Sequence, residues 1–174
     1  GVITRTTFNY CNGLPLSAGT NPSTIKLFFL DIGLYNALHD TRWADIFGLS
    51  SDRLLTRGAM AEQFVAQHLK FINPKNPAPE LYYWLYNKRK GAAEIDFIHS
   101  HGGDIYPIEV KAGKTGKIKS LWKYIEEKNP EYVVKFDLMK RKKRVSMIKH
   151  KQPSVDSKKE LISNLIGLPL FERS

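Results

Sequence analysis

Three charged residues, Asp96, Glu109 and Lys111, lie in segments that otherwise have the apolar, alternating pattern of buried β-strands. A charged side chain in a buried strand is costly unless it is exposed or paired. A hairpin turn between the two strands can bring Asp96 and Glu109 side by side, and adjacent carboxylates repel each other unless a cation lies between them. Oxygen ligands of this kind suit Mg²⁺, whose coordination is completed by water and substrate phosphate.

Phosphodiester hydrolysis is the chemistry that these residue types allow. A Mg²⁺ ion held by Asp96 and Glu109 would polarise a phosphoryl oxygen, and Lys111 would orient the attacking water or offset developing negative charge. Glu62 is the best-placed additional carboxylate, because it lies in a predicted helix among alanines whose small side chains permit close approach to a sheet. The alternative for the strand residues is a cross-strand ion pair on a solvent-facing sheet surface. For Glu62 the alternative is a solvated helix residue.

The elements that must position these residues follow from the hydrophobic periodicity. Residues 1–24 are rich in Thr, Asn, Gly, Ser and Pro and predict a turn-rich arm or the tail of a preceding unit. Asp31 is a predicted N-cap. The helix at 115–128 has an apolar stripe of Ile118, Leu121, Trp122 and Ile125, which is expected to be buried in the core. A mixed α/β sheet flanked by helices is the expected fold. The predicted strands are 26–30 (short and buried), 81–86, 92–99, 104–111, 132–136 and 144–148; the predicted helices are 31–38, 52–71, 115–128 and 158–166; and 100–103 forms a hairpin turn.

The net charge of +10 is concentrated in one part of the chain. Between Lys111 and Lys151 there are 14 Lys and Arg residues against 4 Asp and Glu, whereas the rest of the chain has 13 of each. Such a block is either a solvated, solubilising face or the electrostatic footprint of a polyanion-binding surface. A predicted turn within it is the candidate for contacts with a nucleic-acid backbone. Its residues are Lys140, Arg141, Lys142, Lys143 and Arg144.

Four stretches of the chain resemble the C-terminal domain, of unknown function, found in a family of prokaryotic AAA+-type ATPases, within the PD-(D/E)XK nuclease superfamily. They are Lys26–Tyr35, Arg57–Phe64, Glu94–Phe97 and Pro107–Gly113. The resemblance implies a restriction-endonuclease-like fold with a small N-terminal appendage. It assigns metal ligation to Asp96 and Glu109, the catalytic lysine to Lys111 and the helical acid to Glu62, with Glu94 as a family-typical neighbour. Ile95 precedes Asp96 where the superfamily motif has Pro.

The resemblance also implies a division of the chain. Residues 1–51 would be an arm, strand and helix linking to a preceding ATPase part, and residues 52–174 the nuclease-like domain. The stretch Ala112–Thr115 ends like a Walker A loop but lacks its first glycine, so no ATP site is expected within this chain.

Three functional hypotheses follow. The first is a Mg²⁺-dependent nuclease acting on DNA, with RNA as the second choice. In the second, the same fold has no useful turnover and binds nucleic acid or a partner protein for an attached ATPase. In the third, the domain serves assembly alone. The single Cys11 and the lack of an apolar run of membrane-spanning length predict a cytoplasmic protein that does not enter a membrane.

Overall fold

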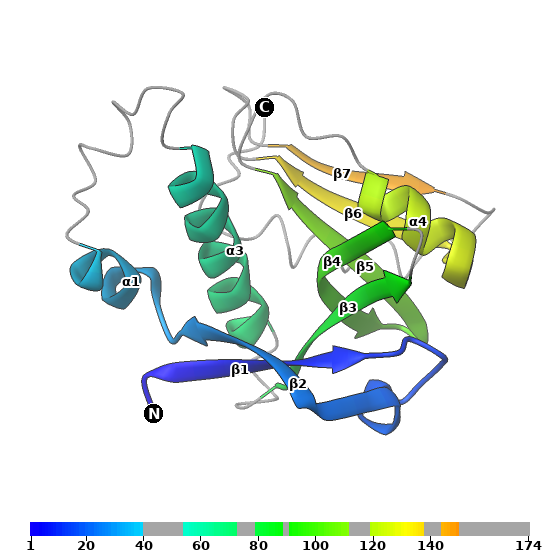
Figure 1. Ribbon diagram of the computed structural model, residues 1–174, viewed down its shortest axis with the longest axis horizontal. Helices are drawn as coiled ribbons and strands as arrows, with labels where there is room; N and C mark the ends of the chain where they lie inside the picture. Colours follow the sequence, from blue (N-terminus) through cyan, green and yellow to red (C-terminus); the bar gives the residue numbers. More distant parts are fainter. Residues whose placement is uncertain (40–53, 73–78, 89–90, 112–118, 138–143, 150–174) are drawn as a thin grey trace.

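One mixed β-sheet organises the protein (Figure 1). The computed structural model describes residues 1–39, 54–72, 79–88, 91–111, 119–137 and 144–149, with the backbone alone at 54–57, 87, 88, 91, 137 and 144–149. In these ranges seven strands lie in the order β2-β1-β3-β4-β5-β6-β7. The β1–β3 and β5–β6 pairs are parallel and the other neighbours antiparallel. The strands are β1 Ile3–Asn9, β2 Thr20–Phe29, β3 Leu81–Lys88, β4 Gly91–His101, β5 Asp104–Lys111, β6 Tyr132–Asp137 and β7 Arg144–Lys149.

Two helices, α3 (Leu54–Phe71) and α4 (Lys119–Lys128), cover opposite faces of this sheet. Alternate residues of β6 divide between two buried clusters: Tyr132 and Val134 belong to the cluster that includes α3, and Val133 to the cluster that includes α4. Because successive side chains of a strand point to opposite faces, the two clusters lie on the two sides of the sheet. The α/β class with a helix-flanked mixed sheet is therefore confirmed.

Most of the predicted elements after residue 52 are present. β5 has the predicted bounds, and β3, β4, β6 and β7 extend the predicted strands by one to two residues. The β4–β5 turn is the predicted one, with positive φ at Gly102 (58°) and Gly103 (90°), a conformation that glycine adopts without a steric penalty. The expected helix at 158–166 and the basic turn at 140–143 lie outside the described residues.

The buried face of α4 differs from the predicted stripe. Leu121 and Tyr124 are each 1% exposed, whereas Trp122 is 56% exposed. The prediction that Trp122 belongs to the core is wrong, because the face toward the sheet is centred on Leu121, Tyr124 and Ile125. Ile118 lies outside the described residues.

The turn-rich arm predicted for residues 1–24 is wrong in its secondary structure. β1 and β2 form an antiparallel hairpin through a 3₁₀ turn at Leu16–Gly19, and β1 also pairs in parallel with β3. β1 went unpredicted because its buried positions include Thr4, Thr6 and Asn9 in place of an apolar alternation. The sheet therefore continues across the domain boundary predicted at residue 52.

β2 contains residues 26–29 of the strand that was predicted at residues 26–30. The strand lies at the edge of the sheet, and its Leu27 is 61% exposed, so the expectation of a buried strand is wrong. The helix that follows, α1 (Ile32–Leu38), begins at the predicted cap, where Asp31 accepts a hydrogen bond of 3.0 Å from the backbone N–H of Leu34.

A β-bulge interrupts β4 beside the candidate site. Tyr82 pairs with Ile98 but Trp84 pairs with Ile95, so Asp96 and Phe97 together lie opposite a single residue of β3. Ile95 and Ile98 accordingly pack in the same cluster, on the α4 side. The strict alternation predicted for this strand is wrong, because the bulge changes the face to which the following residues point.

No helix within the described parts of the chain is long and apolar enough to cross a membrane.

Candidate active site

Asp96 lies at the bulge in β4, with only 9% of its surface exposed. The β4–β5 ladder runs as far as the pair Phe97 and Ile108. Just beyond it, the Asp96 Oδ2 atom accepts a hydrogen bond of 2.7 Å from the backbone N–H of Val110. This bond ties the Asp96 carboxylate to the residue that follows Glu109. Burial raises the pKa of Asp96, while the Val110 hydrogen bond and the charges of Lys26 and Lys111 oppose that rise.

Glu109 is more deeply buried, with 2% of its surface exposed. Its Oε1 atom forms an ion pair with the ammonium group of Lys111, two residues along β5. Its Oε2 atom is buried and has no hydrogen-bond partner among the described residues. Burial first, and then the negative charge of Asp96, raises the pKa of Glu109 to about 7, while Lys111 opposes the rise. A buried carboxylate oxygen without a partner is costly, and it is an available ligand.

Glu62 lies on α3, near enough to these carboxylates for their charges to act on it. Its pKa is raised to about 7 by burial and then by the charge of Asp96, with smaller effects of the same sign from Glu94 and Glu109. The next residue, Gln63, is 1% exposed and holds the helix against β2. The Gln63 side chain donates a hydrogen bond of 2.7 Å to the Phe29 carbonyl and accepts one of 2.8 Å from the Phe29 N–H.

Two residues that the sequence reasoning did not assign to the site complete it. Lys26 of β2 forms an ion pair with Glu94 of β4, and its Nζ atom lies 4.9 Å from the centroid of the Tyr83 ring. Lys26 also lowers the pKa of Glu62 and Asp96. The sequence feature that could have identified Lys26 is its charge beside the apolar residues of β2. The family resemblance identified Glu94 only as a neighbour of Asp96 and assigned it no role.

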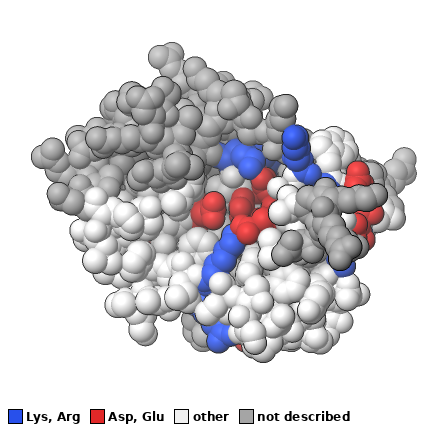
Figure 2. All heavy atoms as spheres, viewed as in Figure 1, with Lys and Arg blue, Asp and Glu red and all other residues white. Residues whose placement is uncertain are grey.

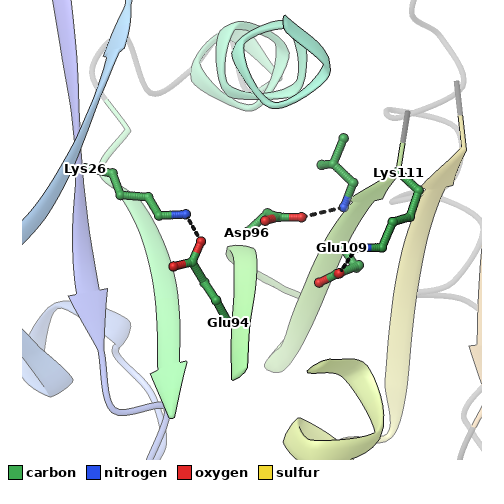
Figure 3. Close-up of polar contacts among 6 residues, drawn as sticks. Lys26, Glu94, Asp96, Glu109 and Lys111 are labelled. Carbon is green, nitrogen blue, oxygen red and sulfur yellow. Dashed lines mark hydrogen bonds and ion pairs between the residues drawn. The ribbon is translucent and has the colours of Figure 1, made fainter. Parts of the chain in front are cut away.

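The figures show how these side chains lie. Acidic side chains gather near the middle of one face, with basic side chains on either side of them (Figure 2). In Figure 3, Lys26 and Lys111 approach from opposite sides, with Asp96 between them and α3 above. The structure thus brings Glu62, Asp96, Glu109 and Lys111 into one electrostatically coupled group.

The side chains predicted to contact nucleic acid are not among those that the structure describes. Lys140, Arg141, Lys142 and Lys143 are outside the described residues. Arg144 is the first residue of β7, where it pairs with Asp137, and its side chain is not described.

The side chains present are consistent with a divalent cation held by two carboxylates. Mg²⁺ in proteins is usually bound by one or two carboxylates, with water and substrate phosphate completing its shell. Asp96 and Glu109 supply the oxygen ligands, and the unpartnered Oε2 atom of Glu109 is the vacant acceptor. Within the described ranges, no three His, Cys, Asp or Glu side chains are arranged to hold a metal. A cation at this site would therefore rely on water or substrate for its further ligands.

A family model described as Domain of unknown function (DUF4143) matches residues 57–161, which is more than half of the chain. The matched range contains Glu62, Glu94, Asp96, Glu109 and Lys111, whereas Lys26 lies before it. No curated protein and no solved structure matches the chain.

Proposed function

The chain belongs to the family described as Domain of unknown function (DUF4143), and we propose that this member is a nuclease-like domain that hydrolyses phosphodiester bonds of DNA with the help of Mg²⁺. One observation carries the proposal: the buried Glu109 has one oxygen paired with Lys111 and the other without a partner in the described residues, next to the buried Asp96. Burying adjacent acids is unfavourable unless a cation compensates them.

Each residue has a distinct part in this proposal. Asp96 and Glu109 hold the cation, which when bound would act as a Lewis acid on the phosphate and lower the pKa of bound water. The Val110 N–H keeps one oxygen of Asp96 fixed, which leaves the other for ligation. Lys111 provides a positive charge for the phosphate. Glu62, whose pKa is about 7, is suited to exchange a proton near neutral pH.

The substrate and partner parts of the proposal rest on the sequence. The basic block between Lys111 and Lys151 favours a polyanion, and DNA is preferred to RNA. The domain serves an AAA+-type ATPase in the same full-length chain; this part is supported by the four-segment resemblance.

A second function has its own supporting observation. Lys111 is ion-paired with Glu109, and the described residues contain no three-ligand metal arrangement. A lysine that neutralises the buried acid in this way could replace the cation. The domain would then be an inert module that binds nucleic acid or a partner protein for the ATPase.

The experiment that tests the proposal is incubation of the purified protein with supercoiled plasmid in Mg²⁺ and, separately, in EDTA. Nicking is expected with Mg²⁺ only, because the carboxylates alone provide no Lewis acid. Asp96→Ala and Lys111→Ala proteins, purified in the same way, serve as the controls. Nicking that survives both substitutions would come from a contaminant. A protein that binds Mg²⁺ or DNA but never nicks would support the inert module.

Binding to DNA is expected to depend steeply on salt. Replacing Lys140, Arg141, Lys142 and Lys143 with Gln should weaken binding and reduce the slope of log affinity against log salt concentration, by up to about 0.9 for each phosphate that the protein no longer neutralises. Fluorescence anisotropy of a labelled duplex between low and moderate salt measures both quantities. Affinity that is indifferent to salt would contradict nucleic-acid binding and leave a protein partner.

A further inference from the structure

Lys26 reaches the site from a strand that is not adjacent to β4. It lies on β2 at the edge of the sheet, where its backbone pairs with Thr6 of β1. Its ammonium group is ion-paired with Glu94 on β4 and lies 4.9 Å from the ring centroid of Tyr83 on β3. β1 and β3 lie between β2 and β4 in the sheet order, so this ion pair joins two strands that are not neighbours in the sheet. Figure 3 shows it approaching from the side opposite Lys111.

Stability alone does not explain this reach. The side chains of Lys26 and Glu94 are 22% and 39% exposed. Ion pairs with this much solvent exposure contribute little, and holding a long lysine in one extended conformation costs conformational entropy. The contact instead places a positive charge at the site, because the Lys26 ammonium group meets Glu94 two residues before Asp96 on β4.

The acids of the site outnumber its ammonium groups by two. Its acids are Glu62, Glu94, Asp96 and Glu109, and its ammonium groups are those of Lys26 and Lys111. When all six groups are ionised the sum is two negative charges. In two-metal phosphodiesterases the cations lie about 3.5–4 Å apart and together stabilise the attacking and leaving oxygens. Here the Glu109 carboxylate has an oxygen without a partner in the described residues, whereas the Glu94 carboxylate is already ion-paired with Lys26.

We propose that the Lys26 ammonium group takes the place of a second divalent cation, so that the site binds a single metal ion. Lys26 is then a specificity-determining residue: it fixes the number of cations and presents a fixed positive charge to the substrate phosphate from the side opposite Lys111. This inference rests on the proposed function, because it presupposes that Asp96 and Glu109 bind a cation.

The test is a count of bound Mn²⁺ ions per chain, from the electron paramagnetic resonance signal of free Mn²⁺ during a titration. The wild-type protein is expected to bind one ion. Lys26→Met should bind two, because removing the ammonium group releases Glu94 and Glu62 as ligands. Glu94→Gln, which keeps the ammonium group and removes a carboxylate, should bind one. Lys128→Met is the matched control, because that lysine contacts Asn12, outside the site, and its variant should also bind one.

The outcomes separate this inference from the proposed function. A wild-type protein that binds no Mn²⁺ would remove both. A wild-type protein that binds two ions would overturn the role of Lys26 and leave the proposed function in place. A single ion in both the wild type and Lys26→Met, with unchanged affinity, would do the same. Should Lys26→Met fail to fold, Lys26→Gln carries the same expectation with a polar side chain, and circular dichroism identifies which variants are folded.

Discussion

Replacing Lys111 with Met should lower the rate of Mg²⁺-dependent plasmid nicking by about 10²–10³-fold, the usual effect of removing one group that stabilises transition-state charge. The Lys111 ammonium group contacts the Glu109 carboxylate that would hold the cation, so it would lie beside the phosphate being cleaved. Met preserves most of the side-chain length and its apolar stem. Initial nicking rates at saturating Mg²⁺ measure the effect, with Mn²⁺ binding recorded in parallel.

The matched control is Lys123→Met on α4. Lys123 is also ion-paired with nearby acids, Glu126 at 2.9 Å and Glu127 at 3.5 Å, but it lies outside the acidic group. Its replacement makes the same change in charge and should leave the nicking rate unaltered. An unchanged rate in Lys111→Met would sink the catalytic assignment. Loss of Mn²⁺ binding in Lys111→Met would show that Lys111 acts by holding Glu109 in place.

Replacing Glu109 with Gln should make the metal-free protein more stable at pH 8 and leave its stability unchanged near pH 4.5. Burial and the charge of Asp96 raise the pKa of Glu109 from 4.5 to about 7 in the folded protein. Below about pH 4.5 the carboxyl is protonated in both the folded and the unfolded chain, so it has no effect on stability. As the pH rises toward 7, the unfolded chain releases the proton first, so the free energy of unfolding falls. Above pH 7 the carboxylate is ionised in both states, and the full destabilisation remains.

Gln resembles the protonated acid, so the replacement should raise the free energy of unfolding at pH 8 by about 1–3 kcal/mol. Urea denaturation in EDTA at the two pH values measures the difference between Glu109→Gln and the wild type. The variant is compared with the wild type at each pH because His99 also makes stability depend on pH. Burial lowers the pKa of His99 to about 4, so this residue makes both proteins more stable as the pH rises toward neutral. Glu126→Gln, at an exposed position, should show no such gain. A Glu109→Gln protein less stable than the wild type at pH 8 would contradict the buried charge.

The sequence predicted the fold where local pattern and global packing agree. The alternation of Tyr106, Ile108 and Val110 gave β5 its bounds, because those residues face the buried α3 side. The same signal failed for β1, whose buried positions are occupied partly by threonines and whose neighbours are distant in sequence. It also failed for Trp122, because a helical stripe of apolar residues does not by itself reveal which of its members faces the sheet.

Prediction of the site had a different limit. Asp96, Glu109 and Lys111 stood out because charges are rare within apolar strands, and strand pairing brings them together. The position of Asp96 depends on a β-bulge that could not be predicted from the residue types in β4. Lys26 joins the group only through the sheet order, since it lies 68 residues before Glu94, and only the assembled sheet brings these two residues together.

The pairing of β1 with β3 fixes the smallest segment that can be expected to work alone. The family match begins at Arg57, yet β1 separates β2 from β3 and forms hydrogen bonds to both. A fragment cut at the matched boundary would leave the backbone groups of β3 open to pairing with another chain. It would also lose the residue that reaches Glu94. The range matched by the family model is therefore shorter than the segment that forms the sheet. Fragments for experiments should include the whole sheet.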